Sequence, residues 1–323
     1  MKKIILVLIG SLLAFSVNAQ QESFFKEHNV FQHLDASVTL GTTGIGFDVS
    51  SPVGDYVNLR AGFDFMPHFH HNMNFGVQVG ETNDKSKFNK LATYLEELTG
   101  YKVNDHVKMI GLPTYNNVKF LVDVFPFKQN KCWHVTAGFY LGPSKIAEAY
   151  NSTEDMPSLL AVGIYNHIYP KAINEEPFIT VTMDGVQQGW PDDPEIQEKL
   201  HKKFAGYGRM GMHVGNYKSD GTPYMMEPGE DGMVKASVKV NSFKPYLGIG
   251  YGGRLFKNSD KYHVAVDCGV LFWGGTPSIK THDGTDLAKD VDNIGGKVGD
   301  YVDLISSFKV FPVLNVRFVK SIF

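Results

Sequence analysis

Apolar and polar positions alternate along the carboxyl-terminal residues 309–323. The apolar parity holds Leu314, Val316, Phe318 and Ile322. The polar parity holds Asn315, Arg317 and Ser321. A period of two residues is typical of a β-strand with one apolar and one polar face. We therefore expect this segment to be a strand that separates an apolar environment from a polar one.

The same alternation recurs along the chain and predicts eight strands: 34–41, 43–51, 55–66, 116–126, 132–142, 243–256, 261–273 and 309–323. After the first hairpin, short connections alternate with long ones. The short connections are 52–54, 127–131 and 257–260, and the long ones are 67–115, 143–242 and 274–308. An even number of antiparallel strands, with short turns at one end and long loops at the other, is typical of outer-membrane barrels. The pattern therefore predicts an all-β fold, a transmembrane antiparallel β-barrel of eight strands.

Two alternatives to this fold are open. Ten or twelve strands would result if residues 178–183 and 233–240 formed a further hairpin. A water-soluble antiparallel sandwich would show the same alternation. The membrane barrel is favoured because the apolar faces are almost uninterrupted and because aromatic residues recur near strand ends, as in an interfacial girdle. These aromatic residues are Trp133, Tyr251, Tyr262, Phe272 and Phe323.

The amino-terminal residues 1–19 have the pattern of a secretory signal peptide. Two lysines precede an apolar run over residues 4–17, and a small-residue cleavage site ends at Ala19. We expect export, removal of this segment and a periplasmic lead-in at 20–33; an uncleaved anchor helix is the alternative. The net charge of -3 argues against nucleic acid as a partner, because a nucleic-acid binder carries a basic face. Two cysteines are too few for a disulfide framework, and we expect both to be free thiols.

The long connections contain helical patterns. Apolar residues recur at helical spacing at Phe88, Leu91, Leu95 and Leu98, at Ile196, Leu200 and Phe204, and at Leu287, Val291 and Ile294. Gly100 ends the first pattern, and Asp193 with Pro194 begins the second. We therefore expect helix-containing extracellular segments that fold into an outer cap, with a surface for an extracellular protein, a glycan or another envelope protein. A solvated, variable surface without a partner is the alternative.

The strands and the closing aromatic residue resemble the small outer-membrane barrels of the OmpA, OmpX and OmpW type. The resemblance is greatest over 43–48 (TGIGFD) and 244–252 (KPYLGIGYG), and it covers only the strands. It implies the cell outer membrane of a Gram-negative envelope, with outer-membrane lipid and the barrel assembly machinery as partners. It also implies an assembly signal at Phe318, Ile322 and Phe323. Since the family includes adhesins, channels, lipid-modifying enzymes and structural proteins, it implies a location and no activity.

Charged residues on the inward parity predict the state of the lumen. The residues expected to form a lumen network are Arg60, Asp64, Lys119, Asp123, Lys244, Asp267 and Arg317. The interior of an eight-stranded barrel is narrow enough for side chains to fill it, and buried charges are stable mainly when they are paired. We therefore expect ion pairs to plug the lumen. A structural or surface-binding barrel is the favoured function, and a small-solute channel with an open lumen is the alternative.

Candidate catalytic or metal chemistry is sparse. His68, His70 and His71 are the residues that would bind zinc or copper, but no carboxylate or cysteine completes a ligand set beside them. Asp64 near these histidines leaves an outer-membrane hydrolase open as a distant alternative. The sequence holds no GxSxG, HExxH or P-loop motif. We therefore expect no cofactor, no metal and no enzymatic activity.

Overall fold

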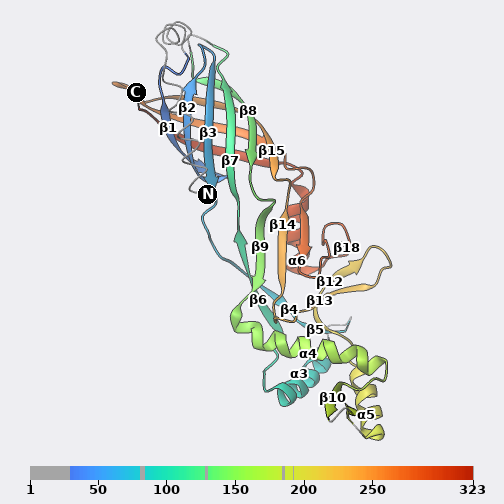
Figure 1. Cartoon of the computed structure of the whole chain (residues 1–323). Helices are drawn as coiled ribbons and strands as arrows, with labels where there is room; N and C mark the ends of the chain where they lie inside the picture. The colour runs from blue at the N-terminus through green and yellow to red at the C-terminus, as the bar shows by residue number, and fades with distance from the viewer. Residues whose placement is uncertain (1–29, 81–83, 128–129, 184–185, 192, 323) are drawn as a thin grey trace.

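The computed structural model describes residues 30–322, except 81–83, 128–129, 184–185 and 192. The expected signal peptide, most of the expected lead-in and Phe323 lie outside the described residues. The molecule is elongated, with a barrel at one end and a folded cap at the other (Figure 1). The cap comprises residues 66–115, 142–242 and 272–310.

The predicted barrel of eight antiparallel strands is confirmed. Its strands are β1 (Asp35–Gly41), β2 (Gly44–Pro52), β3 (Val57–Phe65), β7 (Asn116–Val124), β8 (Trp133–Leu141), β15 (Phe243–Phe256), β16 (Ser259–Leu271) and β19 (Phe311–Ser321). They form a ring in the order β1-β19-β16-β15-β8-β7-β3-β2. The closing strand β19 pairs with both β16 and β1, which joins the two ends of the sheet. This is the architecture that the resemblance to small outer-membrane barrels implied.

The alternative of ten or twelve barrel strands is wrong. β10 (Ile179–Met183) pairs with β11 (Val186–Trp190) in a separate two-stranded sheet. β14 (Lys235–Lys239) pairs with β9 (Lys145–Asn151) and β17 (Ser278–Thr281) in the cap. Alternation shows only that one face of a strand is apolar; it does not identify the neighbouring strand.

A five-stranded sheet extends one wall of the barrel into the cap. Its order is β17-β14-β9-β6-β4, where β6 is His106–Pro113 and β4 is His71–Gly76. Each of these strands directly precedes or follows one barrel strand in the sequence. The corresponding barrel strands are neighbours in the same order, β16-β15-β8-β7-β3. The strands β9 and β14 therefore run on from the barrel wall without a change of neighbours (Figure 1).

The two faces of this sheet continue the two faces of the barrel. Tyr115, Val240 and Trp273 lie at the junctions, on the inward parity of their barrel strands, and all three are buried. The same parity carries Val107, which joins the hydrophobic core of the cap together with Val302 of the nearby helix α6 (Gly296–Ser307). The interior face of the sheet is thus packed, and the opposite parity forms an exterior face continuous with the outside of the barrel.

The remaining cap elements pack around this core. The helices are α3 (Lys85–Thr99), α4 (Met156–Ile173) and α5 (Pro194–Ala205), preceded by the short turn η1 (Thr153–Asp155). The small strands are β5 (Gln78–Val79), β12 (Met210–Tyr217), β13 (Pro223–Met226) and β18 (Val291–Asp292). Within the described residues, none of the helices is long and apolar enough to span a membrane.

Two of the three predicted helices are confirmed and one is misplaced. α3 ends at Gly100, which has a φ of 75°, and the Asp193 side chain accepts hydrogen bonds at the start of α5. Residues 287–294 were expected to be helical but form a turn and β18, and the helix begins later, at Gly296. Leu287 and Val291 are both buried in the cap core, so their apolar spacing reflects packing and not a helical face.

Candidate functional site

The barrel interior contains a dense set of buried polar side chains. The seven residues expected in the lumen network, Arg60, Asp64, Lys119, Asp123, Lys244, Asp267 and Arg317, are all buried. They are contributed by five of the eight strands, because alternate residues of each strand point inward. The structure brings six of the seven into ion pairs, in two clusters.

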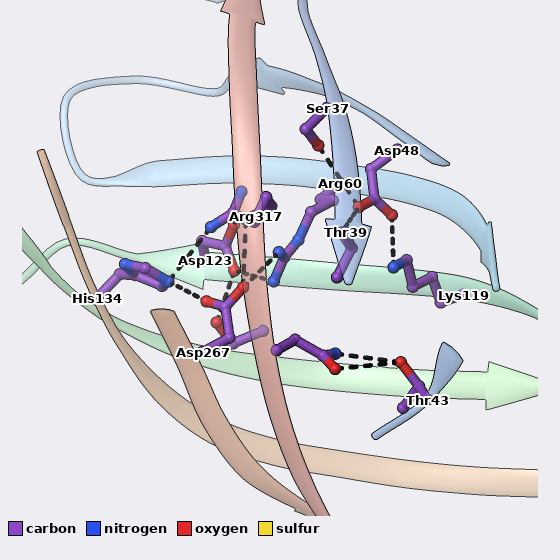
Figure 2. Close-up of polar contacts among 12 residues, drawn as sticks. Ser37, Thr39, Thr43, Asp48, Arg60, Lys119, Asp123, His134, Asp267 and Arg317 are labelled. Carbon is purple, nitrogen blue, oxygen red and sulfur yellow. Dashed lines mark hydrogen bonds and ion pairs between the residues drawn. The ribbon is translucent and has the colours of Figure 1, made fainter. Parts of the chain in front are cut away.

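The first cluster surrounds Asp267 on β16. Its carboxylate lies 3.2 Å from Arg60 Nη1, 3.2 Å from Arg317 Nε and 2.7 Å from His134 Nε2. Asp123 pairs with Arg60 at 2.9 Å and lies 3.8 Å from Arg317. Figure 2 shows the five side chains converging from different strands on one region of the lumen. The positive charges of two arginines therefore balance the negative charges of two aspartates within this cluster.

The second cluster surrounds Lys119 on β7. Its ammonium nitrogen lies 2.8 Å from Asp48 Oδ1 and 2.5 Å from Asp64 Oδ1. Asp48 also accepts a hydrogen bond of 2.7 Å from the hydroxyl of Thr39 (Figure 2). Lys119 thus forms ion pairs with two buried carboxylates, and the Thr39 hydroxyl donates a further hydrogen bond to one of them. Asp48 lies on the inward parity of β2 but was not among the expected network residues.

Lys244 stands apart from both clusters. It lies at the end of the barrel next to the cap and is fully buried. Its ammonium group donates to Asn117 Oδ1 at 2.9 Å and to the Ser242 carbonyl at 3.3 Å, and it lies 5.8 Å from the centre of the Tyr115 ring. The structure therefore does not bring Lys244 to a carboxylate, although the sequence grouped it with the network.

An aromatic and aliphatic layer closes the cap end of the lumen. It was not expected as a unit, and it comprises Tyr115, Leu121, Tyr140, Tyr246, Leu271 and Val313. Tyr140 and Tyr246 meet edge to face with ring centres 5.7 Å apart. The sequence does contain a signal for this layer. Tyr246 is a large apolar residue among inward-facing positions of β15 that are otherwise lysine or glycine. Lys119 Nζ lies 6.0 Å from the centre of the Tyr140 ring, so the second ionic cluster borders this apolar layer.

Gly250 makes space for the contact between His134 and Asp267. β15, which carries Gly250, lies between β8 and β16 in the ring. A Cβ atom at Gly250 would lie 2.1 Å from His134 Nε2 and 2.6 Å from Asp267 Oδ1, far inside van der Waals contact. Glycine at this position is therefore required for the two side chains to meet across the intervening strand.

The outside of the barrel is a continuous belt of exposed apolar residues. It includes Val38, Leu40, Phe47, Val49, Leu59, Phe63, Val118, Phe120, Val122, Val135, Leu247, Ile249, Val266, Leu314 and Phe318. Near the end with the short turns, Trp133 and Tyr251 pack edge to face with ring centres 4.9 Å apart. Soluble monomers rarely expose contiguous apolar patches of more than a few hundred Å². A belt around a whole barrel therefore needs an apolar environment.

Two of the expected assembly residues, Phe318 and Ile322, lie toward the end of the barrel away from the cap. Phe318 on β19 points outward and belongs to the belt, and Ile322 is also exposed. The backbone amide of Ile322 donates to the Leu34 carbonyl at 2.8 Å, which extends the β1–β19 pairing beyond Ser321. Phe323 lies outside the described residues.

The three histidines do not form a metal site. His71 Nε2 lies 2.9 Å from the Tyr301 hydroxyl of α6, and His68 and His70 are exposed. Within the part of the chain that the structure describes, no three His, Cys, Asp or Glu side chains are grouped so that they could hold a metal ion. Asp64 is engaged by Lys119 and does not form an acid–base pair with these histidines.

No protein-family model matches the sequence, and no curated protein matches it. Among solved structures, the crystal structure of CarO2 from Acinetobacter baumannii aligns with a TM-score of 0.39 and 14% identity, over 90% of this chain and 99% of that chain. CarO from the same organism aligns with a TM-score of 0.38 and 14% identity, over 89% and 97%. At these values the likeness assigns no function to the chain.

Proposed function

We propose that the chain is an integral outer-membrane β-barrel protein in which a plugged barrel anchors a folded cap outside the cell, with a structural or surface-binding role. The observation that carries the proposal is the polarity of the barrel. Its apolar residues lie outside and its charged residues lie inside, the reverse of a water-soluble protein. Only a closed barrel or a helix satisfies all backbone groups in lipid, and closed barrels of this size are typical of outer membranes.

The proposed orientation follows from the connections. The strand ends joined by the short connections β2–β3, β7–β8 and β15–β16 lie at one end of the barrel, and the cap emerges from the other end. Outer-membrane barrels carry short turns on the periplasmic side and long loops outside. The cap then faces the exterior, where it is available to a protein or a glycan. The assembly machinery and membrane lipid remain the proposed partners of the barrel itself.

A plugged lumen supports anchoring over conduction. The contacts between Arg60 and Asp267 and between Arg317 and Asp123 cross the lumen, and the apolar layer around Tyr246 fills its cap end. An eight-stranded barrel leaves room only for its own side chains or one small ligand. The proposal accordingly assigns no catalytic role and no steady solute flux to the barrel.

Two measurements on one sample test the proposal. Purified protein should migrate faster on a gel before boiling than after, as folded barrels in detergent do, and should be recovered with the membrane fraction. In a planar bilayer the same sample should give no stable stepwise conductance, while an open porin in the same lipid gives steps. Recovery in the soluble periplasmic fraction would overturn the membrane location, and reproducible steps would overturn the plugged lumen and favour a small-solute channel.

A further inference from the structure

The exterior face of the five-stranded cap sheet is strongly basic. Register and parity place five lysines on it, and these are Lys108, Lys145, Lys235, Lys239 and Lys280. The strand pairing places two acidic residues on this face. Glu148 is on β9, and Asp286 is bridged to Lys280, with its buried carboxylate accepting a hydrogen bond of 2.6 Å from the Ser278 hydroxyl. The chain as a whole has a net charge of -3, so this excess of positive charge is local.

Three of the lysines form a compact group. Lys239 of β14 lies directly opposite Lys145 of β9 and directly opposite Ser278 of β17. Lys280 is two residues beyond Ser278 on the same face, which makes it a diagonal neighbour of Lys239. Directly opposite residues have Cβ atoms about 5 Å apart and diagonal neighbours about 7–8 Å apart. Long lysine side chains at these spacings reach one anionic group together.

Internal ion pairs neutralise only part of this charge. Lys145 pairs with Glu148, and Lys235 pairs with Asp231 at 2.7 Å. Lys239 and Lys280 are exposed, and the ion pairs found among the described residues include neither of them. Like charges that face each other on neighbouring strands are destabilising. An external anion at this position would relieve that repulsion.

The lysine group lies just beyond the cap end of the apolar belt, and both are on the exterior face of the molecule. Leu141 of β8 and Phe243 of β15 are paired in register and are 48% and 52% exposed, so they belong to the belt near its cap end. Lys145 and Lys239 are each four residues farther along, about 13 Å at the usual rise per residue. A lipid whose acyl chains lie against the belt would place its polar head beside these ammonium groups.

We propose that Lys145, Lys239 and Lys280 form a binding site for the phosphate-bearing headgroup of an outer-leaflet lipid. This inference rests on the proposed membrane location and outward cap. A lipid is favoured over a soluble anion because the site is on the exterior face, continuous with the belt, and not in a closed cavity. Basic residues at a membrane surface attract anionic headgroups by about 1 kcal/mol each, which corresponds to roughly fivefold in affinity.

The test compares two double variants of the full-length protein in mild detergent. Lys239→Glu/Lys280→Glu reverses the charge of two residues of the site. Lys87→Glu/Lys90→Glu makes the same change of charge at exposed positions of α3, at the far end of the cap (Figure 1). Each protein is titrated with a bis-phosphorylated glycolipid and with the same lipid after phosphatase treatment, and bound lipid is counted by native mass spectrometry. We expect wild type and the α3 variant to bind the phosphorylated lipid equally. The site variant should bind at least about 25-fold more weakly, from about fivefold for each lysine.

Four outcomes would overturn the site. Three of them are equal binding by the site variant and wild type, equal loss of binding in the α3 variant, and undiminished binding of the dephosphorylated lipid. Displacement of the lipid by millimolar inorganic phosphate would reassign the lysines to a soluble anion and would also overturn it. The gel shift on boiling is recorded for every protein. If wild type shows the gel shift on boiling but does not bind the phosphorylated lipid, only the lipid site is refuted. If wild type shows no gel shift, the proposed function is refuted.

Discussion

Arg60 and Asp267 lie on opposite walls of the barrel, and yet Arg60 Nη1 is 3.2 Å from Asp267 Oδ2. Their strands, β3 and β16, are separated by three strands in either direction around the ring. The strands of Arg317 and Asp123, β19 and β7, are also separated by three strands in either direction, and these side chains approach to 3.8 Å. Two contacts that each span the full width of the barrel block the lumen at this level.

Arg60→Ala should strongly destabilise the barrel. The substitution leaves Asp123 and Asp267 without one of their two arginines in a buried environment (Figure 2). Breaking a buried ion pair by removing one partner costs about 3–5 kcal/mol. The measurement is the free energy of unfolding in urea, followed by the gel shift of the folded barrel.

Arg254→Ala is the matched control for this prediction. Arg254 pairs with Asp260 near the short turn after β15, where the two side chains are 61% and 76% exposed. An exposed pair of this kind contributes about 0–1 kcal/mol. Equal effects of the two substitutions would show that the lumen pairs do not hold the barrel together.

Gly250→Ala should disrupt the lumen, whereas Gly253→Ala should be tolerated. Both glycines lie on β15, but a Cβ at Gly250 would collide with His134 and Asp267, while one at Gly253 has nothing within 4 Å. Overpacking of a filled interior typically costs about 1–3 kcal/mol. Urea unfolding of both variants measures the difference. Identical unfolding curves would mean that the contact between His134 and Asp267 does not depend on the absence of a side chain at Gly250.

The sequence predicts the barrel well because alternation is a local signal. The lipid-facing positions of each barrel strand are on one parity and are mostly apolar, because membrane and lumen impose opposite requirements on the two faces of a strand. The opposite parity locates the lumen side chains: Arg60, Asp123, Asp267 and Arg317 are all on it and all meet. Which of them pair depends on the strand order around the ring, and that order is a long-range property that alternation does not contain.

Local alternation and spacing do not determine the structure of the cap. Val291 and Leu287 have helical spacing, but they are buried in a core built from segments far apart in the chain, and β18 forms there because β12 offers it a partner. Lys244 has the parity of the network, yet it lies near the Tyr115 ring at the mouth, away from the carboxylates. In both cases the neighbours that decide the outcome come from distant segments.

Acidification should weaken the cap through Asp283. Burial raises the pKa of this carboxyl, but hydrogen bonds from the Thr281 hydroxyl, the Thr285 amide and the Tyr224 hydroxyl outweigh burial, so its pKa lies below the ordinary value. A carboxyl with a lowered pKa contributes stability above its unfolded pKa of about 3.9, and this stability is lost as the pH falls through the folded pKa. We therefore expect the cap to unfold in less urea at pH 3 than at pH 6.

Tyr224→Phe isolates this contribution. The Tyr224 hydroxyl lies 2.8 Å from Asp283 Oδ2, and its loss should destabilise the cap at pH 6 by about 1.5–3 kcal/mol, the usual range for a hydrogen bond to a charged group. The difference from wild type should shrink as the pH falls and Asp283 protonates. Circular dichroism at 222 nm reports the cap, since the described α-helices all lie there. A difference that stays constant from pH 6 to pH 3 would contradict the assignment to Asp283.

Cys268 should face the lipid. It is exposed on the outside of β16, directly opposite Ile249 and Leu314, which are both 55% exposed. In Cys132→Ser, a nitroxide attached to Cys268 in urea before folding should be relaxed more by oxygen, which partitions into lipid, than by a water-soluble nickel chelate once the barrel is in a bilayer. Ser219→Cys, in a chain without the two native cysteines, places the same label on an exposed turn of the cap and should show the opposite order. If nickel relaxes both labels equally, β16 faces water, and the membrane location of the barrel is wrong.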